Sequence, residues 1–109
     1  MSEEKFYKET EEKLKALLGD LWIEYKDDAR DWAKSLARLE WAIAKGESPI
    51  ANKMAYEHLT KIGIPCFVQK MRGRVESEVV NFVETFFKSL VDYAIAAGMA
   101  YFTGKITKL

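Results

Sequence analysis

The segment WIEYKDDARDWAKSLARLEWAI, residues 22–43, carries the most regular pattern in the chain. Its apolar residues recur at spacings of three and four, so an α-helix would place all of them on one face: Trp22, Tyr25, Ala29, Trp32, Leu36, Leu39 and Ile43. A seam of this kind, sustained over about three heptads, predicts a helix that packs lengthwise against another helix. We therefore expect an all-α fold, built as a helical bundle.

Trp41 lies on the opposite side of this helix, together with Asp27 and Lys34. The two charged residues suit a surface in water, whereas an indole does not. Because Ala37 and Ala44 beside it are small, the ring would project from the helix, which predicts that Trp41 packs against a second surface. A singly exposed tryptophan is the alternative.

Composition limits the class of protein. With 109 residues the chain is expected to form one domain, and 49% hydrophobic content with only two prolines favours helices over strands. The 17 basic and 17 acidic residues cancel, which disfavours nucleic acid as a partner. The polar start MSEEKFYKETEEK lacks the apolar core of a signal peptide, and one cysteine cannot form an internal disulfide. We expect a cytoplasmic protein.

Caps and breakers predict helices over about residues 3–18, 20–45, 49–62 and 65–103. Ser2 is suited to cap the first helix, and Gly19 followed by Asp20 indicates a stop and a new start. A lone glycine costs only about 1 kcal/mol within a helix. One continuous helix from about residue 4 to 45 is therefore the alternative.

The third helix is expected to end at Gly63, and Pro65 then starts the fourth. The predicted apolar face of the third helix comprises Ala51, Met54, Ala55, Leu59 and Ile62. This prediction places Cys66 as a small residue in the turn between the two helices, with Phe67, Val68 and Met71 on the inner side of the fourth.

The fourth helix is the longest, unless Gly73 breaks it. Apolar residues recur along it at three, four and four, the eleven-residue repeat of a nearly straight helix: Val68, Met71, Val75, Val79, Phe82, Phe86, Leu90, Tyr93, Ala97 and Tyr101. A helix over residues 65–103 would span about 58 Å, whereas a compact domain of this size is roughly 34 Å across. The molecule is then elongated, or another copy covers the excess.

No charged residue occurs between Tyr93 and Gly104, which is typical of a helix surrounded by protein or by lipid. Extending this segment to the length of a membrane span would bury Glu84, Lys88 and Asp92, so we expect no membrane insertion. Small residues four apart would instead let a helix of another chain approach closely. The predicted interface of a homo-oligomer comprises Trp41, Ala94, Ile95, Gly98, Met99 and Phe102.

Residues that carry chemistry are few. His58 and Cys66 could form a nucleophile pair across the Gly63 turn, but no orienting third group is recognisable, and no catalytic residue, metal site or cofactor is predicted. An acidic stripe (Glu24, Asp27, Asp28 and Asp31) and a basic run (Lys61, Lys70, Arg72 and Arg74) stand out. The stripe could bind a divalent ion and the run a phosphate or nucleic acid, but we expect the two to pair within or between subunits.

The run AYEHLTKIGIPCFVQKMRGRVESEV, residues 55–79, resembles the small helical domain at the end of the larger subunit of light-independent protochlorophyllide reductase. The matching residues are Ala55, Leu59, Ile62, Ile64, Pro65, Phe67, Val68, Met71, Arg72, Arg74, Val75 and Glu76. Gly63, Gln69 and the apolar residues after Val79 depart from that family's pattern. The resemblance covers about a quarter of the chain, implies a docking module near a tetrapyrrole or redox partner, and assigns no catalytic residue.

These observations favour a non-catalytic helical interaction or scaffold protein that acts as a homo-oligomer, with another protein as a further possible partner. The alternative is a carrier in which the apolar last helix encloses a flat hydrophobic or tetrapyrrole ligand. The residues that would line its pocket are Phe82, Phe86, Phe87, Tyr93, Met99, Tyr101 and Phe102.

Overall fold

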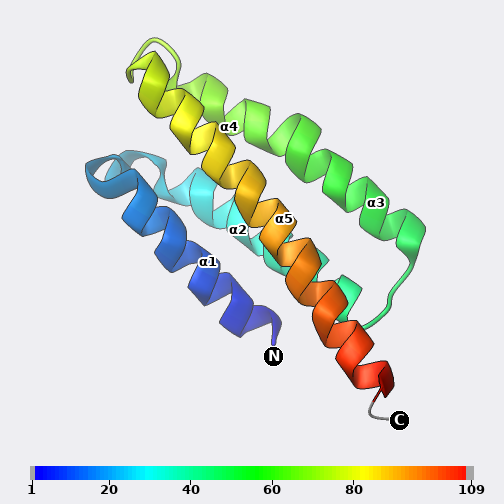
Figure 1. Ribbon diagram of the computed structural model, residues 1–109. Coiled ribbons are helices and arrows are strands. Elements are labelled where there is room, and N and C mark those ends of the chain that lie inside the picture. Colours follow the sequence, from blue (N-terminus) through cyan, green and yellow to red (C-terminus); the bar gives the residue numbers. More distant parts are fainter. Residues whose placement is uncertain (1, 108–109) are drawn as a thin grey trace.

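The computed structural model describes residues 2–107, with side chains through residue 104. Its elements in chain order are α1 (Glu3–Leu18), η1 (Gly19–Leu21), α2 (Trp22–Ala44), α3 (Pro49–Glu57), η2 (His58–Gly63), α4 (Ile64–Met71) and α5 (Ser77–Thr107). Within this range no β-strand forms, and the expected all-α class is confirmed. In Figure 1, α1 and α3 lie on opposite sides of the pair α2 and α5.

The break between the first two helices is real. Ser2 caps α1 as predicted, because its side chain accepts a hydrogen bond from the Lys5 amide. Gly19 ends the helix with φ +53°, a left-handed conformation that favours glycine, and its N–H donates to the Lys15 carbonyl. A 3₁₀ turn then leads into α2, so the alternative of one continuous helix is wrong.

The predicted seam of α2 forms the centre of the core. Every member from Trp22 to Leu39 is buried, and Ile43 is half-buried at the end. Trp32 contacts α5 directly, with its ring centroid 4.6 Å from that of Phe87. A second face of α2 is buried as well and comprises Ala33, Ala37, Glu40 and Ala44. This helix therefore has packing neighbours on more than one side.

The predicted stop at Gly63 is wrong. Residues 49–71 run on as one helical rod, because η2 widens to a π-helical turn in which the Ile64 N–H donates to the Leu59 carbonyl. Pro65 has no N–H to donate, and in a regular α-helix its ring would crowd the carbonyl four residues earlier. The π-helical turn adds one residue to the helical turn just before Pro65, which lets the helix continue through the proline. The predicted apolar face is also incomplete, since Met54 and Ile62 are more than half exposed and only Leu59 is buried.

Gly73 does break the last predicted helix. It adopts φ +80° in a turn where the amides of Arg74 and Val75 both donate to the Met71 carbonyl. α4 buries Phe67, Val68 and Met71 as predicted. α5 then starts at Ser77 and continues past the predicted end at residue 103, to Thr107.

The predicted apolar stripe of α5 is wrong over much of its length. Val79, Phe82, Tyr93 and Tyr101 are exposed, whereas Leu90 of the predicted stripe is buried. The other buried residues belong to a neighbouring face: Val80, Val83, Phe87, Val91, Ala94 and Gly98. The chain reverses after α4, so the helical phase read from α4 does not carry into α5. Because α5 is apolar on several faces, the sequence pattern was compatible with both phases.

The bundle measures 52 × 24 × 20 Å. The 31 residues of α5 span about 46 Å at 1.5 Å per residue, and therefore run nearly the whole length of the molecule. The elongated shape alone accommodates the long helix, and helix length no longer requires a second copy. None of the helices described between residues 2 and 107 is long and apolar enough to cross a membrane.

Candidate functional site

The α3–α5 groove is a depression lined mainly by apolar side chains. It has a volume of about 420 Å³ and lies between α3 and the end of α5, over the last turns of α2. Its lining residues are Leu39, Ile43, Gly46, Glu47, Pro49, Asn52, Lys53, Tyr56, Ile95, Met99 and Phe102. Such a volume and lining suit an apolar ligand or a side chain of another protein.

The loop after α2 sets the width of this groove. Gly46 turns the chain with φ +72°, and Ser48 and Pro49 restart it as α3, with the Ser48 hydroxyl accepting from the Ala51 amide. The ring of Phe102 packs so closely over Gly46 that a Cβ there would collide with it. This contact holds the end of α5 against the loop, while α3 stands away and buries none of its residues.

The predicted interface residues divide into two groups. Ile95, Met99 and Phe102 line the groove as a cluster. Ala94 and Gly98 do not: both are buried against the chain's own core, and a Cβ on Gly98 would lie 2.8 Å from the Glu40 carbonyl oxygen of α2. Their predicted role in close approach to another chain is therefore wrong, because α2 already occupies that position.

Trp41 packs against another helix of the same chain, α5. Its ring is half-buried and lies 6.1 Å, between centroids, from that of Tyr101 on α5. The Lys45 ammonium lies 5.7 Å from the centre of the indole. The expected packing is thus present, but the intermolecular contact is not needed to explain it.

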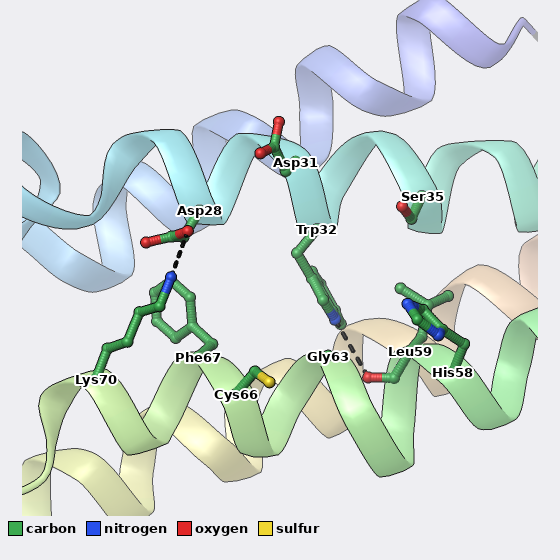
Figure 2. A pocket seen from close by; sticks show the side chains of 10 residues that line it. All are labelled: Asp28, Asp31, Trp32, Ser35, His58, Leu59, Gly63, Cys66, Phe67 and Lys70. Atoms are coloured by element: carbon green, nitrogen blue, oxygen red, sulfur yellow. Dashed lines mark hydrogen bonds and ion pairs between the residues drawn. The ribbon is translucent and has the colours of Figure 1, made fainter.

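A second, polar depression lies where α2 faces the π-helical turn, and we call it the π-turn pocket (Figure 2). Its volume is about 190 Å³, and its lining residues are Asp28, Asp31, Trp32, Ser35, His58, Leu59, Gly63, Cys66, Phe67 and Lys70. Figure 2 shows Trp32 reaching from α2 to the turn, where its N–H donates to the Leu59 carbonyl oxygen at 3.3 Å. Gly63 permits this approach, because a Cβ there would lie 3.0 Å from the indole.

His58 and Cys66 both line the π-turn pocket, but Figure 2 shows the tip of Trp32 and Leu59 between them, so they are not brought together as a nucleophile pair. Cys66 is exposed, so the expectation that it fills the turn is wrong. At the other end Lys70 donates to Asp28 at 2.8 Å, and this hydrogen bond raises the pKa of Lys70. Among the residues described, no group of three His, Cys, Asp or Glu side chains is arranged to hold a metal ion.

The acidic stripe and the basic run pair within the chain. Lys70 binds Asp28, and Arg74 forms an ion pair with Glu24 at the start of α2. Arg72 instead reaches Glu84 on α5 at 4.0 Å. The prediction that these opposite charges meet is confirmed for Lys70 and Arg74, and the exposed pairs fix register more than they add stability.

Glu40 is a residue that the sequence analysis did not single out. Its side chain is completely buried in α2, and neither carboxyl oxygen has a hydrogen-bond partner in the described structure. Burial, together with the charge of Glu9, raises the pKa of Glu40 to about 7, and the amino-terminal charge acts in the opposite direction. The spacing of Ala33, Ala37, Glu40 and Ala44 was the available signal, since it marks a second buried face.

Searches of family models, curated proteins and solved structures found no match to this chain. The resemblance of residues 55–79 to the protochlorophyllide reductase domain therefore stays a prediction. Function has to be inferred from the surface and the interior of the molecule itself.

Proposed function

We propose that the chain is a non-catalytic helical interaction protein that associates with a second copy of itself through the α3–α5 groove. The observation that carries this proposal is the exposed apolar side chains of α3, a helix of which only Ala55 is among the partly buried residues packed against the core. α3 buries none of its residues, and Ile50 and Met54 on it are 75% and 67% exposed. Met99, 52% exposed, adds to the apolar surface in the adjoining groove.

Burial of these side chains supplies the driving force. Covering a large aliphatic side chain contributes about 1.5–3 kcal/mol, and Ile50, Met54 and Met99 are three such residues. Two copies each offer both a groove and exposed apolar side chains, which an isologous pair uses twice. The formal net charge of zero means that no long-range repulsion opposes association.

Two matched variants test the location of this contact. Met99→Glu places a charge in the groove, and Val79→Glu places one on the same helix about 30 Å away. Both parent residues are exposed, so neither change should disturb the fold. Light scattering should show a lower mass for Met99→Glu and the wild-type mass for Val79→Glu. Equal masses for the two variants would remove the groove from the interface.

A carrier of a small apolar ligand is the second candidate, favoured by the volume of the α3–α5 groove. Of the residues named for such a pocket, Met99 and Phe102 do line it, whereas Phe87 lies in the core and Phe82 is 62% exposed. The local resemblance would make the ligand a tetrapyrrole. A visible absorbance band in protein purified from its native host would favour this carrier, and a spectrum with only the aromatic band would favour self-association.

We also propose a reducing compartment, the cytoplasm, as the protein's location. Cys66 is a free thiol on the surface, and such a thiol persists where disulfides are kept reduced. Fractionation of native cells with an antibody to the protein tests this directly.

A further inference from the structure

We propose that Glu40 is a proton-binding site that controls the docking of α1. With Glu40 protonated, α1 stays packed on α2 and α5. When the proton is lost, the buried charge is relieved by movement of α1 away from the bundle, with the 3₁₀ turn at Gly19–Leu21 as the hinge. This inference concerns α1 and does not depend on the α3–α5 groove.

The position of Glu40 carries the first step. It lies where the backbone of α5 comes closest to α2, since a Cβ on Gly98 would meet the Glu40 carbonyl oxygen. α1 lies near the same part of α2, since Glu9 of α1 is close enough for its charge to act on Glu40. The side chain is thus enclosed, and its two oxygens have no partner among the residues described. An ionised carboxyl in such a place is costly unless water reaches it.

The charges around Glu40 do not compensate it. Glu9 on α1 carries the same sign, and the amino-terminal charge is the one that opposes it. α5 has no charged residue between Tyr93 and Gly104, and its titratable groups there are the phenols of Tyr93 and Tyr101. Just after α2, Lys45 is paired with Glu47. Burial and the charge of Glu9 together outweigh the amino-terminal charge, so loss of the proton leaves a negative charge that access to solvent would stabilise.

α1 is the helix that moves in this proposal. It is the first helix, lies at the edge of the bundle in Figure 1, and buries four side chains along one line: Phe6, Thr10, Leu14 and Leu18. α1 is held to α2 by the Arg30–Glu11 ion pair at 2.8 Å and to α5 by the stacked rings of Phe6 and Tyr93, and these contacts must break when it leaves. α2 and α5 are held together through Trp32, Phe87 and the Gly98 contact. Gly19, with φ +53° and no neighbour within 4 Å of its Cβ position, gives the hinge room to turn.

Hydrogen exchange of α1 tests the proposal, with intrinsic exchange rates corrected for pH. In the wild type, opening of α1 should increase up to about tenfold per pH unit between the ordinary carboxyl pKa and the raised one, and level off above it. The apolar replacement Glu40→Met should abolish this pH dependence. Glu9→Gln removes the like charge and lowers the pKa of Glu40 in the docked state, so the rise should start at the same pH, level off at a lower pH and be smaller in total.

Two results would overturn the proposal. One is the same pH dependence of α1 exchange in wild type and Glu40→Met. The other is exchange of the α1 amides at the same rate as those of α2 and α5, which would mean that α1 never leaves separately. If Glu40→Met fails to fold, an unchanged profile in Glu9→Gln counts against the proposal in the same way.

Discussion

At the residue scale, Gly98 and Glu40 are the two buried positions at which a substitution should change the stability of the fold most informatively. Because Gly98 has no side chain, α5 packs so closely on α2 that a Cβ at this position would lie 2.8 Å from the Glu40 carbonyl oxygen. Glu40, directly beneath that contact, introduces a carboxyl into an otherwise apolar layer. Both residues lie in the interior, and stability measurements on single variants can assess each of them.

Stability should fall as pH rises, with Glu40 as the cause. The folded pKa, about 7, lies above the ordinary value of 4.5, so the folded state binds the extra proton between these values. The contribution is complete below pH 4.5 and is lost as pH rises through 7, a difference of about 3 kcal/mol. Urea denaturation at several pH values measures it, with Glu40→Met as the control that should be flat. A wild-type stability that rises over this window contradicts the assignment.

Replacing Gly98 by leucine should destabilise the folded chain by about 1–3 kcal/mol, because the added carbon atoms collide with the Glu40 carbonyl and Ile43. Gly104→Ala is the matched control, since no atom lies within 4 Å of its Cβ position. Chemical denaturation of both variants gives the comparison. If Gly98→Leu kept wild-type stability and lost only its ability to associate, Gly98 would belong to an interface between chains after all.

Residue roles were only partly predictable from the sequence. The Ser2 cap and the pairing of Lys70 with an acidic residue of α2 follow from local rules on caps and charges. The position of Gly98 does not, because a small residue in a helix indicates close approach without saying which helix approaches. Glu40 was missed because alanines give a weak apolar signal on a second helical face.

At the scale of elements, the ends of α1 and α2 were predicted well and the path of residues 49–71 was not. Gly19 and Gly73 act through positive φ, a property of single residues. Gly63 has an ordinary helical conformation and serves instead to admit the Trp32 ring. Whether a glycine before a proline stops a helix depends on such tertiary contacts, which no local pattern contains.

The turn between α4 and α5 gives a test of backbone strain. Gly73→Ala should destabilise the protein by about 1–2 kcal/mol, because alanine is disfavoured at φ +80°. Gly73→Asn should lower the stability by less than Gly73→Ala, since asparagine tolerates this conformation. Nothing lies within 4 Å of the Cβ position, so a steric clash cannot produce the difference. Thermal unfolding with alanine and asparagine equally stable would argue against strain as the reason for glycine here.

At the scale of the whole molecule, the all-α class was predictable from the seam of α2, but the arrangement of the helices was not. The 52 Å length of the bundle accounts for α5 without a second copy. The burial of Ala94 and Gly98 removes part of the predicted interface, and the exposed apolar side chains of α3 with the adjoining groove take its place. The case for self-association now depends on exposed side chains rather than on helix length.

Sedimentation velocity of the wild-type protein, from low to high micromolar concentration, tests self-association most directly. The account predicts a mass that rises from that of one chain, 12.5 kDa, toward that of two as concentration increases. The rise should persist at high salt, because the proposed contact is apolar. A constant mass of 12.5 kDa at every concentration would contradict self-association through the α3–α5 groove.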